Sequence, residues 1–297
     1  MRSRTLRRWT AALATAALAG TGLVGPATEA SADVPGYEVV RHTSGATNSY
    51  PTRTTTAECT GDNELIGMGA SVFPTQTEVL LESVVPDLND DTVEVFARES
   101  ATGTGNSWRV QAYAVCADPG QVQGRYLATD DHTISSGGLE TNSALAECDP
   151  GDRTLSAGFV LSGAAGRIHL TTLMPTEDSA LVVGQEDQTT TNALWTVEAI
   201  ALCADMFDSE VYWDESFAVS TSNGRTHWTE CPEDYRVSGS GGFAWDETGA
   251  IGTQNIYAFE PSAFDGLDYG VVSSNEPRPG TPDQSTLYGY VVCIDLN

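Results

Sequence analysis

Residues 108–118 of the chain read WRVQAYAVCAD, and their apolar side chains fall on alternate positions. Trp108, Val110 and Cys116 share one parity, whereas Arg109 and Gln111 take the other. Period two is the pattern of a β-strand with one buried face. The stretch therefore predicts a strand that turns its tryptophan and its cysteine toward a core.

This stretch recurs twice along the chain. Residues 195–205 read WTVEAIALCAD, and residues 285–295 read STLYGYVVCID. A second marker lies upstream of each copy, as AEC at 57–59, AEC at 146–148 and TEC at 229–231. Further markers keep their distance from that first cysteine: small residues after eight and ten positions, then a proline after 27, 27 and 30. They are Gly67, Gly69 and Pro86; Ser156, Gly158 and Pro175; Gly239, Gly241 and Pro261. The chain is therefore expected to hold three diverged copies of one repeat of about 85–90 residues.

The N-terminus has the pattern of an export signal. Arg2, Arg4, Arg7 and Arg8 precede an apolar run, and the small residues of 30–32 follow it. We expect a signal peptide over residues 1–32, with an uncleaved membrane anchor as the alternative and with the general or twin-arginine export route left open. The expected repeats are residues 33–122, 123–207 and 208–297.

The predicted fold class is all-β. Short alternating segments are separated by Gly, Pro, Asn, Asp and Ser, and no helical stripe of about ten residues appears. Each repeat is expected to hold about four or five strands. The links at 119–124 and 206–210 are short, which favours one threefold, β-prism-like body over the alternative of three tandem β-sandwiches. The small residues after each first cysteine predict a bulge or a close backbone approach.

Six cysteines in an exported chain predict three disulfides, although six allow fifteen pairings. The repeat pattern favours one bridge in each copy, and pairing across repeats stays open as the alternative. The favoured bridges are Cys59–Cys116, Cys148–Cys203 and Cys231–Cys293.

The chain is strongly acidic, with a formal net charge of −27 and no lysine. Removing residues 1–32, which hold four Arg and one Glu, makes the charge −30. Such a charge repels nucleic acid and anionic lipid, so neither is an expected partner, and no membrane insertion is expected after signal cleavage. Solvation of an outer surface explains the acidity most simply, and a cationic partner is the alternative.

No motif in the sequence predicts catalysis, a cofactor or a metal. There is no Gly-x-Ser-x-Gly elbow, and the four histidines have no metal-ligand spacing. The acidic run Asp87-Leu88-Asn89-Asp90-Asp91 resembles the start of a calcium loop but lacks the glycine and the distal glutamate of an EF-hand. Forty acidic residues in the mature chain make chance carboxylate pairs unavoidable, so these pairs carry little information.

The third repeat diverges from the other two. Ser285 stands where the first two copies have tryptophan, and residues 207–297 hold 14 of the 24 aromatic side chains. Exposed aromatic rings beside polar groups are typical of sugar sites, whereas large rings in general fill cores. The candidate ligand-binding residues are therefore Trp213, Trp228, Trp245 and Tyr257, with a core role for these rings as the alternative.

The order of Glu-Cys, small residues, Pro, Trp and a closing AVCA at 114–117 resembles uncharacterised secreted repeat proteins of actinobacteria over the whole mature chain. More distantly, three cysteine-bearing β-repeats resemble the vitelline-membrane outer-layer proteins, whose fold is a β-prism of three Greek-key sheets. Residues 89–92, Asn-Asp-Asp-Thr, are similar to a short acidic segment of that family. The resemblance implies a three-sheet prism with a coat or carbohydrate-associated role.

These observations favour a secreted, extracellular, non-enzymatic binding or coat protein that recognises an extracellular glycan. A secreted hydrolase with carboxylate or Ser/His chemistry is one alternative. A secreted protease inhibitor that presents the 275–284 loop is another.

Overall fold

All regular secondary structure in the described part of the chain is β-strand. The structure is a computed structural model and describes residues 35–45, 50–74, 78–135, 140–187, 193–205, 209–218, 224–246, 255–264, 267–275 and 285–295; the side chains of 209–211, 213–218, 245–246, 264 and 285 are not described. Residues Ala32–Asn297 form one compact unit. The predicted signal peptide lies outside the described residues.

Each predicted repeat contributes six strands, rather than the four or five expected. The first repeat gives β1 (Glu38–Thr43), β2 (Thr52–Glu58), β3 (Glu64–Phe73), β4 (Val79–Asp87), β5 (Thr92–Glu99) and β6 (Arg109–Ala117). The second gives β7 (Gln123–Ser135), β8 (Thr141–Glu147), β9 (Arg153–Ser162), β10 (Ile168–Pro175), β11 (Ser179–Glu186) and β12 (Leu194–Asp205). The third gives β13 (Ser209–Ala218), β14 (Gly224–Glu230), β15 (Arg236–Asp246), β16 (Asn255–Phe264), β17 (Leu267–Asn275) and β18 (Ser285–Ile294).

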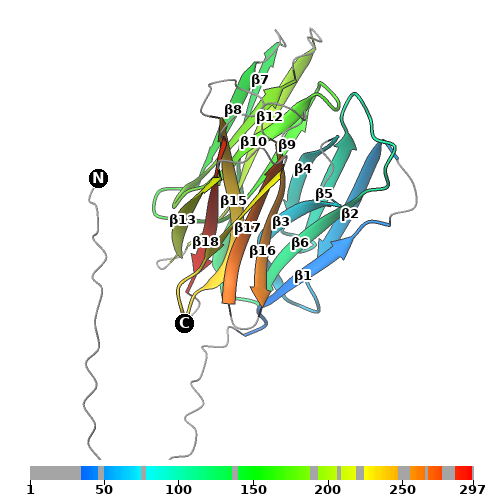
Figure 1. The fold of residues 1–297 in the computed structure, drawn as a ribbon. Coiled ribbons are helices and arrows are strands. Elements are labelled where there is room, and N and C mark those ends of the chain that lie inside the picture. Colours follow the sequence, from blue (N-terminus) through cyan, green and yellow to red (C-terminus); the bar gives the residue numbers. More distant parts are fainter. Residues whose placement is uncertain are drawn as a thin grey trace, which may run out of the picture. The chain divides into compact units, whose positions relative to one another are not determined.

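The strands form three antiparallel sheets of six, which we call sheets A, B and C. Sheet A has the order β1-β6-β3-β16-β17-β14, sheet B the order β2-β5-β4-β9-β12-β7, and sheet C the order β13-β18-β15-β10-β11-β8. Every sheet therefore joins three strands of one repeat to three strands of another. Figure 1 shows β16 and β17 of the third repeat continuing the sheet of β3 and β6.

The seam between repeats is the same in all three sheets. The fourth strand of one repeat pairs briefly with the third strand of the next, in the pairs β4–β9, β10–β15 and β16–β3. Because the last repeat pairs with the first, the exchange closes on itself. The alternative of three tandem sandwiches with separate sheets is wrong, since no sheet belongs to one repeat.

One apolar core cluster takes side chains from all three sheets. Trp108 and Trp195, both at most 1% exposed, lie in it, as their parity predicts. Phe159 of sheet B and Phe259 of sheet A meet there with ring centroids 6.2 Å apart. Burial of such rings supplies much of the stability of a β-protein without helices.

The small residues after each first cysteine lie where the strands of different repeats touch. A Cβ on Gly67 would lie 1.7 Å from the carbonyl oxygen of Ser238. A Cβ on Gly69 would lie 2.3 Å from Cδ of Pro261. The ladder register also shifts between Leu65 and Gly67. The predicted bulge and close approach are thus confirmed, and they explain why glycine and proline keep their spacing.

The three predicted disulfides are confirmed: Cys59–Cys116, Cys148–Cys203 and Cys231–Cys293. The described residues hold no free cysteine. Three bridges indicate an oxidising compartment.

A side-chain clamp fastens the first strand to the third repeat. The Tyr37 hydroxyl lies 2.8 Å from the Val237 carbonyl oxygen and 3.0 Å from Oδ1 of Asp268. Arg236 pairs with the other oxygen of Asp268 at 2.8 Å. Arg125 has the corresponding role between the second and first repeats, where it donates to the Leu65 carbonyl and to Asp91.

Candidate functional site

The four candidate aromatic residues do not gather on one sheet. Trp213 lies in β13 and Trp245 in β15, both in sheet C, and their side chains lie outside the described part of the structure. Trp228 lies in β14 and Tyr257 in β16, both in sheet A. Tyr257 is only 8% exposed and joins the core cluster, which fits the core alternative. Trp228 is 59% exposed and so keeps the character of a ligand platform.

Trp228 stacks on a partner that the sequence did not single out. Its ring lies 5.3 Å from the ring of Tyr269 at an interplanar angle of 18°. Tyr269 comes from the neighbouring strand β17, where its register partner is Glu230. The stack holds the indole in place, because a stacked ring has fewer accessible rotamers than a free one. We call Trp228 and Tyr269 the aromatic platform.

The face of sheet A that carries the platform points away from the core. Val272 and Phe259 take the alternate parity on their strands and are buried in the core cluster. In an antiparallel sheet, directly paired residues share a face. The platform therefore shares its face with the residues paired in line with it across the other strands.

A row of register partners crosses this face, polar on five of the six strands, and its three middle members, Ser71, Ala258 and Ser273, are at most 5% exposed. In order from β1 to β14 its members are Thr43, Gln111, Ser71, Ala258, Ser273 and Thr226, each the register partner of the next. We call them the polar row. Hydrogen bonds link Gln111 Nε2 to Thr43 at 2.8 Å, Ser71 to Gln111 Oε1 at 3.1 Å, and Thr226 to Ser273 at 2.9 Å.

A phenol and a carboxylate lie beside the polar row. Tyr113 pairs in register with Gly69 and Arg41, and its hydroxyl lies 3.2 Å from Gln111 Oε1. Burial raises the pKa of Tyr113, its contact with the Glu260 carboxylate raises it further, and the Arg41 charge acts in the opposite direction. The phenol therefore stays protonated over the whole neutral range, and it is buried with its hydroxyl donating to Gln111 Oε1.

This arrangement is suited to binding a hydroxyl-rich ligand. The exposed Trp228 indole offers an apolar face, and the row members that are not buried, Thr226, Gln111 and Thr43, supply hydroxyl and amide donors and acceptors. Sequence reasoning found Trp228 but missed Tyr269, Tyr113, Gln111 and Glu260. Their proximity depends on the pairing of the third repeat with the first, for which no sequence signal exists beyond the shared Gly and Pro spacing.

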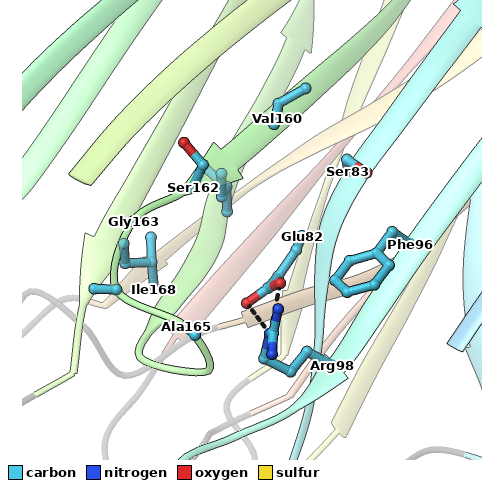
Figure 2. A pocket seen from close by; sticks show the side chains of 11 residues that line it. Glu82, Ser83, Phe96, Arg98, Val160, Ser162, Gly163, Ala165 and Ile168 are labelled. Atoms are coloured by element: carbon cyan, nitrogen blue, oxygen red, sulfur yellow. Dashed lines mark hydrogen bonds and ion pairs between the residues drawn. The ribbon is translucent and has the colours of Figure 1, made fainter. Parts of the chain in front are cut away.

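A second candidate lies at the seam of β4 and β9 in sheet B, where a pocket of about 200 Å³ opens (Figure 2). Glu82 stands at a bulge, since the β4–β5 register shifts between Leu81 and Ser83. Its oxygens accept from Nε of Arg98 at 2.9 and 2.8 Å, and Oε1 also accepts from the backbone N–H of Gly166 at 3.1 Å. Figure 2 shows this ion pair beside the ring of Phe96.

The loop that closes the pocket comes from the second repeat and is held by the first. The Gly166 carbonyl accepts from the backbone N–H of Ala101 at 2.8 Å. Gly166 has a φ of 70°, and an added Cβ would lie 2.6 Å from the Glu99 carbonyl oxygen, so this position requires glycine. The pocket walls are thus fixed by contacts between the two repeats.

The described residues offer no complete catalytic or metal site. Nδ1 of His42 lies 3.0 Å from the Thr55 hydroxyl, but no carboxylate in the described part orients this imidazole. Asp91, in the calcium-loop-like run, already accepts from Arg125 and from the Leu65 N–H. No group of three potential metal ligands occurs among the described residues. The loop of the inhibitor hypothesis, apart from Asn275, lies outside them.

No protein-family model matches the chain, and no curated protein matches its sequence. Among the described residues, no helix is long and apolar enough to cross a membrane.

Proposed function

We propose that this protein is a secreted, non-enzymatic, glycan-binding protein whose ligand lies across the outer face of sheet A. The observation that carries the proposal is the exposed Trp228, fixed on Tyr269 at one end of a face that the polar row crosses. The stack on Tyr269 leaves the other face of the Trp228 indole open to a ligand.

A neutral or weakly charged polysaccharide fits this face best. The formal charge of −27 disfavours polyanions such as nucleic acid and acidic glycans. The six strands of sheet A span about 24 Å at the usual strand spacing. The members of the row that are not buried lie at its two ends, Thr226 on one side and Gln111 and Thr43 on the other. Secretion, suggested by the N-terminal pattern and the disulfides, would bring the protein to such a polymer outside the cell.

The proposal includes the arrangement of the three sheets. The cyclic strand exchange supports a threefold, prism-like body of the kind implied by the resemblance to the vitelline-membrane outer-layer proteins. In such a body each sheet presents one outer face, and the three faces are free to differ. The coat-protein role implied by that resemblance is compatible with glycan binding.

A glycan array and pull-down with insoluble neutral polysaccharides test the proposal. The wild-type mature protein should bind at micromolar concentrations, and Trp228→Ala should weaken binding at least about tenfold, which corresponds to about 1.4 kcal/mol. Leu194→Ala is the matched control, because Leu194 is an apolar residue 68% exposed on β12 of sheet B. No binding by the wild type, or equal losses in both variants, would contradict the proposal.

A further inference from the structure

At the seam that carries the sheet B pocket, one position holds a serine where the other two seams hold an aromatic residue. Val160 and Phe243 occupy equivalent positions, since each is the partner of the residue after a bulge in the preceding repeat. Two residues further along the same strands, Ser162 and Trp245 occupy equivalent positions, and Phe73 occupies that position at the third seam. The serine leaves open the space that a larger side chain could fill.

The ion pair is also specific to this seam. The bulge residue is Glu82 here, Thr171 in the second repeat and Tyr257 in the third. The position of Arg98 is taken by Gln185 and by Asn275. Neutral residues therefore support the same strand pairing twice, and an ion pair whose carboxylate is buried adds a desolvation cost that the fold does not need. This points to a role for the pair other than strand pairing.

Hydrogen-bonding capacity is left over on the pocket wall. Arg98 donates to Glu82 only through Nε, and its guanidinium lies over the Phe96 ring, 5.3 Å from the centroid, so its two Nη groups have no hydrogen-bond partner among the described residues. Glu82 accepts three hydrogen bonds, which leaves one of its roughly four acceptor sites, on Oε2. The hydroxyls of Ser83 and Ser162, which also line the pocket, have no partner in the described part either.

The charges at the pocket favour an uncharged ligand. Glu82 and Arg98 cancel, and the chain as a whole repels anions. Guanidinium donors beside a carboxylate acceptor complement a pair of adjacent hydroxyl groups, because each hydroxyl both donates and accepts. Val160, Ile168 and the edge of Phe96 offer apolar surface for the C–H face of such a ligand.

We propose that this pocket binds the terminal residue of a neutral saccharide, as a site separate from the outer face of sheet A. Its volume of about 200 Å³ is below the range of roughly 300–1,000 Å³ usual for drug-sized ligands, so it admits one end unit rather than a chain segment. The site belongs to a different sheet from Trp228 and uses none of its residues. A single chain with both sites would engage a branched or dense glycan at two points, which raises avidity without new contacts.

Amide chemical-shift titration of the mature protein with methyl glycosides of glucose, galactose and mannose tests this site. At least one glycoside should shift the amides of 163–166 in a saturable way. Ser162→Trp should weaken this binding at least about tenfold, because it introduces the residue type of Trp245 into the pocket. Ser143→Trp is the matched control, since Ser143 is an exposed serine on β8 of sheet C. It should leave the titration unchanged.

Several results would overturn the assignment. One is that none of the three glycosides shifts the 163–166 amides. Another is that acetate or methyl glucuronide binds there more tightly than every neutral glycoside, which would make the site an anion site. A third is unchanged binding by a folded Ser162→Trp variant. Arg98→Lys is a second variant that keeps the charge but loses the planar fork, and it should also weaken binding. The Trp228→Ala variant should bind the glycosides at this pocket as the wild type does, so failure of one site is distinguishable from failure of the other.

Discussion

The two seams that flank the second repeat have the same backbone pairing and different side chains. At the seam of β4 and β9, the bulge residue Glu82 reaches across to Arg98 and to the next repeat. At the seam of β10 and β15, the bulge residue Thr171 bonds to the Val183 carbonyl within its own repeat. Glycine, proline and the bulge therefore maintain the strand pairing at a seam, whereas the side chain on the bulge can differ from seam to seam and form different contacts.

The largest effect is expected from a change to the shared part of the seam. A Cβ on Gly241 would lie 2.2 Å from the Leu173 carbonyl oxygen, so Gly241→Ala should cost roughly 3 kcal/mol of unfolding free energy. Gly105→Ala is the control, because no atom lies within 4 Å of its added Cβ. Urea unfolding measures both. A Gly241→Ala variant as stable as the wild type would show that the close strand contact is absent.

Exchanging the chemistry of one seam for that of the other should have a smaller effect. Glu82→Thr alone should lose about 2 kcal/mol, because Arg98 and the Gly166 N–H lose their acceptor, with the partial exposure of Arg98 limiting the loss. The double variant Glu82→Thr/Arg98→Gln reproduces the residues of the second repeat and should return to within about 1 kcal/mol of the wild type. A double variant less stable than the single one would mean that the seams are not interchangeable.

The clamp of the third seam should contribute less. Tyr37→Phe removes the hydroxyl from Val237 and Asp268 and should cost about 1–1.5 kcal/mol at neutral pH. Burial raises the pKa of Tyr37 above its ordinary value of 10.0, and Asp268 raises it further. The resulting stability is complete below the unfolded pKa and is lost as the pH rises through the folded one. Above about pH 10, the free energy of unfolding should therefore fall more steeply with pH for the wild type than for Tyr37→Phe. Parallel pH curves for the two proteins would contradict the clamp.

The smallest effect on stability is expected from a change at Glu198, which lies on sheet B away from the pocket. Burial raises the pKa of Glu198 above 4.5, and its register neighbour Asp131 raises it further. A raised carboxyl pKa gives stability that is full below the unfolded value and lost as the pH rises, so the charged Glu198 is slightly unfavourable at neutral pH. Glu198→Gln should raise stability by less than about 1 kcal/mol at neutral pH, since the side chain is half-buried and still partly screened by solvent. The gain should vanish by about pH 4, and a gain that persists there would have another cause.

Much of the scaffold was predictable from the sequence, because its markers are local or evenly spaced. The parity of Trp108 and Cys116 predicted the inward strand face, and the repeat spacing predicted the disulfides. The number of strands per repeat was underestimated, because strands such as β1 and β7 lie at sheet edges and lack a buried alternating face.

The sites were far less predictable, because both depend on which strands pair across repeats. Nothing near Glu82 in the sequence indicates that Ser162 will lie beside it. Trp228 was a candidate from the sequence, yet its stacking partner Tyr269 is 41 positions away along the chain, so the sequence does not indicate the stack. Tyr257 was a candidate because the third repeat is rich in aromatic residues, but its side chain is buried in the core. Aromatic content alone therefore could not separate a platform from a core.

Glycan recognition by the two surfaces is tested by binding isotherms on an insoluble neutral polysaccharide. They are measured for the wild type, Trp228→Ala, Ser162→Trp and the double variant. Each single change should weaken binding at least about tenfold, and the double change should weaken it further than either. Binding by the double variant with the affinity of the wild type would contradict the assignment of glycan recognition to these two surfaces.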